Sequence, residues 1–435
     1  MNKSTVAPHF QFQGGILHAE GCSLKKLAQQ YGTPLYVYSR AAINEAYQSY
    51  MQATPNRDVL VCYGMKANSN LAVLQEFARL GAGFDIVSGG ELARVLAAGG
   101  DPAKIVFSGV GKHGWEIQAA LDAGIKCFNI ESIGELERIA AIAAEKDTVA
   151  PIALRVNPDV DARTHPYIST GLKDNKFGID IDLAPEIYNQ ALAHPYLKIV
   201  AVDCHIGSQI TEIGPYLDAL QKLINLIHRL EDNGIAIHHL DIGGGLGIRY
   251  TDETPATPQM LLEPVFAALD KAGLGHLQLV LEPGRSLVGN AGILLTRVEY
   301  LKHTEHKNFA IVDAAMNDLI RPTLYDAWHD VEMVRLPCAD PANALHPLPE
   351  QVYDIVGPIC ESGDWLAKDR TLTLAQDDLL AIMSAGAYAF TMSSQYNTRP
   401  RAAEVMVDGD RSYLVRRREE IQDLFAHEHL LPQSD

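Results

Sequence analysis

Apolar, β-branched runs recur along the chain from residue 59 onward, and segments with helical periodicity separate them. Eight of these runs predict strands: VLVCYG (59–64), GFDIVS (83–88), KIVFSG (104–109), CFNIES (127–132), IALRVN (152–157), IVAVDCHIG (199–207), HHLDIGG (238–244) and LQLVLEP (277–283). The segments between them, such as LAVLQEFARLG and YLDALQKLINLIHRLEDNG, predict helices, and several end in glycine. Nearly continuous apolar strands that alternate with helices indicate parallel strands covered by helices.

The number of strand–helix units favours a (β/α)8 barrel of the TIM type over a doubly wound sheet. Beyond residue 289 the apolar runs remain strand-like with little helix between them, and Asp408-Gly409 is typical of a hairpin turn. We therefore predict an α/β protein in which residues 39–288 form the barrel. Residues 1–38 and 289–435 are expected to form an antiparallel β-barrel or sandwich domain. The connection at 158–181 is long for a barrel, which is typical of a lid or binding loop.

Composition narrows the classes of partner. The chain has 435 residues, of which 47% are hydrophobic, and a formal net charge of −18. An acidic chain of this kind is not expected to bind nucleic acid or an anionic membrane. The six cysteines show no CxxC spacing. Four of them, Cys62, Cys127, Cys204 and Cys360, lie in or beside apolar runs, which is typical of reduced core thiols in a cytoplasmic protein. The N-terminus lacks the apolar core of a signal peptide, and no run of about 18 apolar residues predicts a membrane span.

Polar residues gather where the predicted strands end. In a barrel the active site lies at the carboxyl ends of the strands, because eight loops converge there. Reading those ends gives Lys66, Asp85, Ser108, Glu131, Asn157, His205, Ser208, Gly243, Gly244, Gly245, Glu282 and Arg285. A cluster of this kind at one face of a barrel indicates an enzyme.

Each of these features allows a structural and a chemical interpretation. Lys66 is either a solvated lysine beyond a strand or an amine that forms a Schiff base. The glycines of DIGGGLG (241–247) form either a tight turn or a loop that approaches a phosphate; they do not fit the GxGxxG spacing of dinucleotide sites.

His205 is either a packed core residue or a flat ring that stacks on a ligand, and the absence of HExxH or a second histidine at metal spacing predicts no metal. Glu282 and Arg285 either pair with each other or act separately, on a protonated ring nitrogen and on a carboxylate or phosphate. A Schiff-base lysine, a phosphate loop, a stacking ring and an acid for a ring nitrogen are together what pyridoxal 5'-phosphate requires.

Nearly the whole chain resembles the diaminopimelate decarboxylase family, within the alanine-racemase-like, fold-type III class of pyridoxal-phosphate enzymes. The resemblance lies in YGMKAN (63–68), GFDIVSGGE (83–91), HPYISTGLKDNKFGI (165–179), CHIGSQ (204–209), DIGGGLG (241–247), EPGRS (282–286), MNDLIRPTLYDAWH (316–329), CESGDWLAKDR (360–370) and GAYAFTMSSQYNTRPRAAEV (386–405). It implies decarboxylation of meso-2,6-diaminopimelate to L-lysine and carbon dioxide, the last step of lysine biosynthesis.

The resemblance also implies roles for individual residues. Lys66 carries the cofactor, His205 stacks on its ring, and Cys360 is the proton donor, so these three are the implied catalytic residues. The implied cofactor contacts are Lys66, Asp85, His205, Ser208, Gly244, Gly245, Glu282, Pro283, Gly284, Arg285 and Tyr388. The implied substrate contacts are Arg285, Arg321, Tyr325, Glu361 and Tyr388. Related enzymes are homodimers, which implies that Cys360 and Glu361 enter the barrel of a partner subunit.

Three alternatives stay open. The first is a related decarboxylase of ornithine, arginine or carboxynorspermidine, against which the combination of Arg321 and Glu361 argues, because bare distal amines need only an anion. The second is an amino-acid racemase of the same class, which would carry an arginine where this chain has Glu282. The third is a non-catalytic homologue, which is expected to have lost Lys66 or the glycines.

Overall fold

The computed structural model describes residues 8–161, 176–336 and 348–432. The chain forms two compact units, of which Asn44–Val288 is one and Met1–Ile43 with Gly289–Asp435 is the other. Each unit combines segments whose contacts are mainly within itself, so we describe them in turn.

The unit Asn44–Val288 is a closed barrel of parallel strands, which confirms the predicted TIM-type fold. Its strands are β5 (Val59–Gly64), β6 (Gly83–Ile86), β7 (Ile105–Phe107), β8 (Cys127–Ile130), β9 (Ala150–Asn157), β11 (Leu197–Asp203), β12 (His239–Asp241) and β13 (Gln278–Leu281). Each strand pairs with the next, β13 pairs with β5, and the pairing of β8 with β9 completes the ring. The short β10 (Ile179–Asp180) adds to β9.

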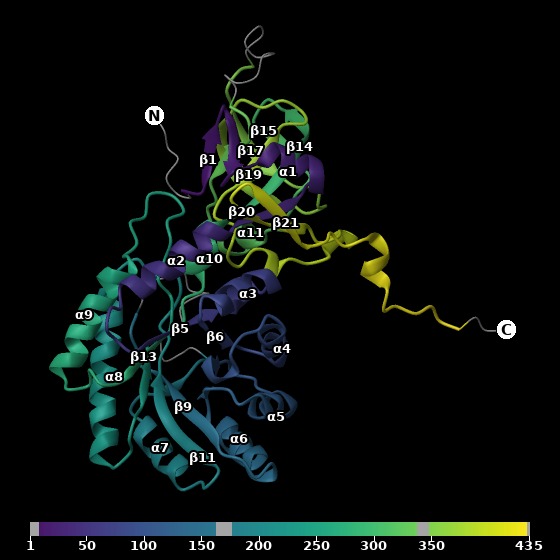
Figure 1. Ribbon diagram of the computed structural model, residues 1–435. Coiled ribbons are helices and arrows are strands. Elements are labelled where there is room, and N and C mark those ends of the chain that lie inside the picture. Colours follow the sequence, from purple (N-terminus) through teal and green to yellow (C-terminus); the bar gives the residue numbers. More distant parts are fainter. Residues whose placement is uncertain (1–7, 162–175, 337–347, 433–435) are drawn as a thin grey trace. The chain divides into compact units, whose positions relative to one another are not determined.

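Helices cover the outside of the barrel strands, as the alternating pattern predicts (Figure 1). They are α3 (Leu71–Arg79), α4 (Gly89–Ala97), α5 (Gly114–Ala123), α6 (Ile133–Glu145), α7 (Ala184–Leu192), α8 (Gly214–Asp232) and α9 (Pro258–Lys271). The short α10 (Arg285–Val288) follows β13. Polar caps fix where several of them begin: Asn70 accepts a hydrogen bond from Ala72 N, and Ser88 accepts one from Glu91 N. These caps end each loop soon after its strand and keep the loops at the strand ends short.

The barrel core combines small interior residues with large aromatic side chains outside the sheet. Small side chains from six strands form one buried cluster: Cys62, Val106, Cys127, Ala153, Ala201 and Val280. Between β5 and α3, the rings of Tyr63 and Phe77 stack with centroids 4.1 Å apart, and both side chains are buried. The outer contact holds α3 against the strand that leads to Lys66.

The second unit is a mostly antiparallel β domain. Its large sheet contains β4 (Leu35–Ser39), β14 (Gly292–His303), β15 (Asn308–Val312), β16 (Val331–Met333), β17 (Gln351–Val356), β18 (Trp365–Leu372), β19 (Leu379–Ile382), β20 (Ala403–Asp408) and β21 (Arg411–Arg416). The N-terminal strand β4 lies between β14 and β20, which joins the two ends of the chain in one sheet. Two pairings, β15 with β17 and β20 with β4, are parallel.

Smaller elements complete this unit. A three-stranded sheet of β1 (Phe10–Gln13), β2 (Ile16–Ala19) and β3 (Cys22–Ser23) precedes α1 (Leu24–Tyr31), and α11 (Arg321–Tyr325) follows β15. The helix α2 (Arg40–Gln52) links the two units in sequence. Residues 162–175 of the expected lid lie outside the described residues. No helix in the described ranges is long and apolar enough to cross a membrane.

We expect Phe77→Ala to lower the free energy of unfolding by about 3–5 kcal/mol, because it empties a buried site beside Tyr63. Leu431→Ala is the control, since Leu431 is 90% exposed and its loss is expected to change stability by less than about 0.5 kcal/mol. Urea unfolding measures both. Equal stabilities of the two variants would contradict the packing argument.

Candidate active site

Lys66 lies at the carboxyl end of β5, in a 3-10 turn over Met65–Ala67. Its neighbours Met65 and Ala67 are buried, whereas the lysine side chain keeps 41% exposure. Its Nζ donates to Asp85 Oδ2 at 3.1 Å, and the parallel pairing of Gly64 with Asp85 brings the two residues together. The strand therefore ends in a lysine whose amine is held over a buried carboxylate, which differs from a fully solvated surface lysine.

Asp85 is buried, and its Oδ1 has no hydrogen-bond partner among the described residues. A buried carboxylate oxygen without a donor is costly unless a ligand or water satisfies it. The unsatisfied Asp85 oxygen beside Lys66 therefore indicates a position where a ligand binds.

Three further carboxyl groups lie in the barrel interior. Oxygen atoms of Asp203, Asp241 and Glu282 lie within 4.8 Å of one another, and all three side chains are buried. Burial, and secondarily the charge of Asp241, raises the pKa of Asp203 and of Glu282 well above the usual range. Burial raises the pKa of Asp241 to about 7. The cluster therefore retains protons that isolated carboxyl groups would lose.

Polar side chains at the ends of β7 and β8 donate hydrogen bonds to Glu282. Glu282 Oε1 accepts from Ser108 Oγ and from Asn129 Nδ2, both at 3.4 Å. Glu131 forms a buried ion pair with Arg155 at 3.0 Å and also accepts from Gly109 N. The barrel interior thus combines several buried carboxyl groups with the buried guanidinium of Arg155.

Asn157, at the end of β9, accepts from Asp159 N at 2.9 Å. This contact lies within the loop that follows β9, and the Asn157 carbonyl also lies 3.4 Å from Ile181 N, its donor.

The glycine loop after β12 approaches neighbouring backbone too closely for side chains. A Cβ on Gly244 would overlap the carbonyl oxygen of Glu282, and one on Gly243 would lie 2.6 Å from Cys204 O. Gly243 and Gly245 also have φ values of +70° and +100°. The loop is therefore more than a tight turn, because its packing also requires bare backbone.

His205 follows β11 and lies against this loop. Its Nδ1 accepts a hydrogen bond from Gly244 N at 3.2 Å. Burial lowers the pKa of His205 well below its usual range, so the ring is neutral. A neutral imidazole held in this way is a flat apolar surface that can stack on a ring.

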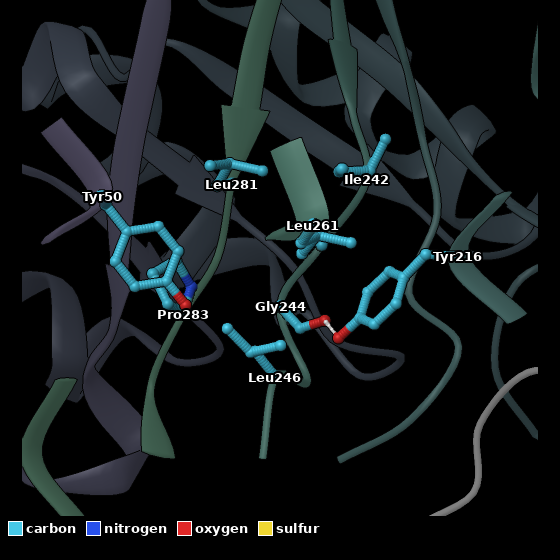
Figure 2. Close-up of a pocket in the computed structure, with 9 residues that line it drawn as sticks. Tyr50, Tyr216, Ile242, Gly244, Leu246, Leu261, Leu281 and Pro283 are labelled. Atoms are coloured by element: carbon cyan, nitrogen blue, oxygen red, sulfur yellow. Dashed lines mark hydrogen bonds between the residues drawn. The ribbon is translucent and has the colours of Figure 1, made fainter. Parts of the chain in front are cut away.

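A small cavity of about 10 Å³ lies behind the glycine loop and is lined by Tyr50, Tyr216, Ile242, Gly243, Gly244, Leu246, Leu261, Leu281 and Pro283. Figure 2 shows Tyr216 pointing its hydroxyl at the carbonyl of Gly244, to which it donates at 3.0 Å. On the opposite wall the Tyr50 hydroxyl lies 2.7 Å from Ser286 Oγ. The Tyr216 hydroxyl therefore holds the glycine loop from the side of this apolar cavity.

Arg285 begins α10 and is held by two hydroxyl groups. It donates to Ser208 Oγ at 3.1 Å and to Tyr250 OH at 2.6 Å. The preceding Pro283 carbonyl accepts from Gly64 N at 3.0 Å, and the Gly284 carbonyl accepts from Leu287 N. The EPGRS turn is thus tied to the end of β5.

The other predicted residues lie in the β domain. Cys360 and Glu361 are exposed in a turn that Asp364 closes by accepting from Ile359 N and Met316 N, each at 2.7 Å. Glu361 Oε2 accepts from Tyr396 OH at 2.8 Å. Cys360 thus differs from the buried thiols expected for this chain, such as Cys62 and Cys127.

Arg321 and Tyr325 lie on α11, which Thr323 joins to this turn by donating to Gly363 O at 2.6 Å. Tyr388 is half-buried in the same unit and has a φ of +55°, in the left-handed region. The structure therefore places the lysine, histidine, glycines and EPGR turn in the barrel, and the cysteine, Glu361, Arg321, Tyr325 and Tyr388 in the β domain.

Sequence reasoning missed several residues that shape these sites. Tyr216 lies on a helix and Tyr250 in a loop, where a tyrosine is indistinguishable from ordinary core. Asp203 and Asp241 are the last residues of β11 and β12, and each lies two positions before a predicted site residue, His205 or Gly243. An acidic residue at the end of an apolar strand was the one signal that could have identified the latter two.

The barrel residues fit a phosphorylated pyridine aldehyde. They offer an accessible amine beside an orphaned carboxylate oxygen, a neutral imidazole, a loop of bare backbone, and a buried carboxyl group. This set of groups corresponds to an aldehyde, a flat ring, a phosphate and a ring nitrogen.

Comparisons with known proteins agree with this chemistry. Residues 40–289 match the family described as pyridoxal-dependent decarboxylase, pyridoxal binding domain. Diaminopimelate decarboxylase from Pseudomonas aeruginosa is 59% identical over 98% of this chain and 99% of its own length. The Vibrio cholerae diaminopimelate decarboxylase is 55% identical over 98% of this chain and its full length. The crystal structure of diaminopimelate decarboxylase from m. jannaschii in complex with L-lysine is 37% identical to this chain, with a TM-score of 0.91. The match covers 98% of this chain and 99% of that one.

We expect the carboxyl cluster to contribute stability to the cofactor-free protein that is lost as pH rises from about 4 to about 7, because the folded state holds protons on the cluster that the unfolded chain releases. Asp241→Asn removes one of these protons, so it is expected to reduce the slope of unfolding free energy by up to about 1.4 kcal/mol per pH unit in this range. Urea unfolding at several pH values measures the slope. The exposed Asp410→Asn is the control, and equal slopes for both variants would contradict the assignment.

Proposed function

Because this chain belongs to the diaminopimelate decarboxylase family of pyridoxal-dependent decarboxylases, we propose that it converts meso-2,6-diaminopimelate to L-lysine and carbon dioxide. The observation that carries the proposal is the identity of 59% with a relative of that name over almost the whole of both chains. The reaction would be the last step of lysine biosynthesis, carried out in the cytoplasm.

The barrel residues hold the cofactor in this proposal. Pyridoxal phosphate, when bound, supplies an electron sink for the bonding pair that remains after carbon dioxide leaves. Lys66 would hold its aldehyde carbon, with Asp85 beside the amine, and His205 would pack on the face of the ring. The phosphate region would be held by Ser208, Gly244, Gly245, Pro283, Gly284 and Arg285, and Tyr388 would contact the cofactor.

Glu282 is proposed to face the ring nitrogen and to keep a proton there. Burial, and secondarily the charge of Asp241, raises the pKa of Glu282. A proton shared between the Glu282 carboxyl group and the ring nitrogen would therefore be retained rather than lost to solvent. Racemases of this class are expected to carry an arginine at this position, so the carboxyl group favours decarboxylation.

The β domain, residues 1–38 and 289–435, is proposed to complete the substrate site and to form the dimer interface. Residues 39–288 are proposed to form the cofactor-binding domain. Cys360 would donate a proton to the α-carbon, from a turn that reaches the barrel of a partner subunit in a homodimer. The exposure of Cys360 and Glu361 supports this arrangement, because a residue that serves another subunit must lie on the surface of its own.

The distal end of the substrate carries both a carboxylate and an ammonium group. Arg285, Arg321 and Tyr325 are proposed to bind the carboxylate, and Glu361 the ammonium. A guanidinium forms two parallel hydrogen bonds with a carboxylate, which gives geometric selectivity as well as attraction. Ornithine, arginine and carboxynorspermidine decarboxylases remain the alternative, and a substrate with a bare distal amine would leave Arg321 without its anion.

The assay that tests the proposal uses protein loaded with pyridoxal phosphate and measures carbon dioxide and product. The meso and L,L isomers of diaminopimelate, ornithine, arginine and lysine are supplied separately, and lysine is expected from the meso isomer alone. Lys66→Ala is expected to abolish turnover because it removes the amine. Release of carbon dioxide from ornithine or arginine would overturn the substrate assignment, and no release from any compound would favour a racemase or a non-catalytic homologue.

We expect Tyr216→Phe to weaken binding of pyridoxal phosphate by about 3- to 10-fold, because the Gly244 carbonyl loses the donor that fixes the loop. Fluorescence titration of cofactor-free protein measures the dissociation constant. Tyr188→Phe is the matched control, since its buried hydroxyl donates to Ala201 O at 2.8 Å in the same barrel, away from the glycine loop. Equal affinities for both variants would show that the Tyr216 hydroxyl has no part in the loop.

A further inference from the structure

We propose that His329 is a positioning residue that orients Arg321 toward the distal carboxylate of the substrate. This inference rests on the proposed function and adds a residue to it. His329 ends the stretch MNDLIRPTLYDAWH and has a fully buried side chain, although neither the cofactor nor the substrate roles above involve it.

The contact between the two residues is short and lies within one unit. Arg321 is the first residue of α11, and its side chain is buried. Its Nη1 donates to His329 Nε2 at 2.7 Å. Since the guanidinium is planar, fixing one of its N–H groups sets the plane in which the remaining donors lie.

The other ring nitrogen determines the tautomer of His329. Nδ1 lies 2.8 Å from the carbonyl oxygen of Met383, and a carbonyl can only accept. Nδ1 therefore carries the proton, and Nε2 presents a lone pair to Arg321. The imidazole is neutral in this arrangement, because a protonated Nε2 could not accept from a guanidinium.

The backbone around His329 is fixed independently of Arg321. Val331 in β16 pairs with Ile382 in β19, and Met383 N donates to Asp330 O at 2.8 Å. Arg370 donates to the His329 carbonyl at 3.0 Å, and its guanidinium lies 3.1 Å from the centre of the Trp328 ring. The ring is therefore a rigid support rather than a side chain that follows Arg321.

A neutral acceptor suits an arginine that binds an anion. A carboxylate in the position of His329 would orient the guanidinium equally well, but it would also cancel part of the charge that attracts the substrate. The imidazole supplies the orientation without that loss. Selectivity for a distal carboxylate would then depend on His329 as well as on Arg321, since a correctly placed donor discriminates far more than a mobile one.

Two substitutions separate the two hydrogen bonds of the ring. In His329→Asn the amide nitrogen can replace Nδ1 and keep the bond to Met383 O, but no atom of the shorter side chain takes the place of Nε2 as acceptor for Arg321. In His329→Gln the amide oxygen can reach the position of Nε2 and accept from Arg321. We expect the Asn variant to raise KM for meso-diaminopimelate about tenfold or more, with a much smaller fall in kcat, and the Gln variant to restore KM to within about threefold.

Further variants test whether the effect passes through Arg321. In an Arg321→Met background, His329→Asn is expected to change KM by less than about twofold, because the group that it orients is gone. His18→Asn is the matched control, since His18 also bonds a backbone carbonyl, Ile16 O at 2.9 Å, in the same unit. An unchanged KM in His329→Asn, or an equally large rise in both backgrounds, would overturn the proposal.

Crystal structures of the two holoenzyme variants provide a readout that does not need turnover. We expect Arg321 to keep its orientation in His329→Gln and to lose it in His329→Asn, and an unmoved guanidinium in the Asn variant would overturn the proposal. Should the unmodified protein release no carbon dioxide from diaminopimelate, the proposed function fails, while these structures still decide whether His329 orients Arg321.

Discussion

The close approach of the glycine loop to the end of β13 is the constraint on which the barrel site depends. Gly244 has no room for a side chain because the Glu282 carbonyl occupies that space, and Glu282 N in turn donates to Gly243 O at 2.8 Å. The same loop gives its Gly244 N–H to His205. One backbone contact therefore places the glycines, the imidazole and the buried carboxyl group in a single arrangement, and bulk at Gly244 would disturb all of them.

This arrangement places acidic groups where water cannot solvate them. Asp203, Asp241 and Glu282 repel one another in the barrel, and burial adds to the cost of ionising them. The chain reduces that cost with protons and with nearby cations, of which Arg155 and Lys66 lower the pKa values of cluster members. Such a site costs stability in the cofactor-free state, and a bound cation or protonated ring would recover part of it.

The strand-and-helix rhythm was sufficient to predict the barrel, because parallel strands buried on both faces leave a clear pattern of apolar runs. The ends of those runs also led to Lys66, His205 and Glu282, since a barrel gathers its strand ends at one face. Tyr216 and His329 could not be found in this way. Their partners become neighbours only when the chain folds. The Tyr216 hydroxyl, for example, donates to the Gly244 carbonyl, which lies 28 positions away in the sequence. The parallel pairings in the β domain were missed for the same reason, because sequence runs do not show which strands pair.

Described arginines of this protein differ in the kind of partner that accepts their hydrogen bonds. Arg155 lies against Glu131, and Arg416 against Glu404, so a carboxylate offsets the charge in each pair. Arg285 instead donates to two hydroxyl groups, and Arg321 to a neutral imidazole. Neutral acceptors fix the direction of a guanidinium without neutralising it. Arg285 and Arg321, which are proposed to meet the substrate carboxylate, thus each donate to a neutral group, and the groups that accept from them help to set the direction of the remaining donors.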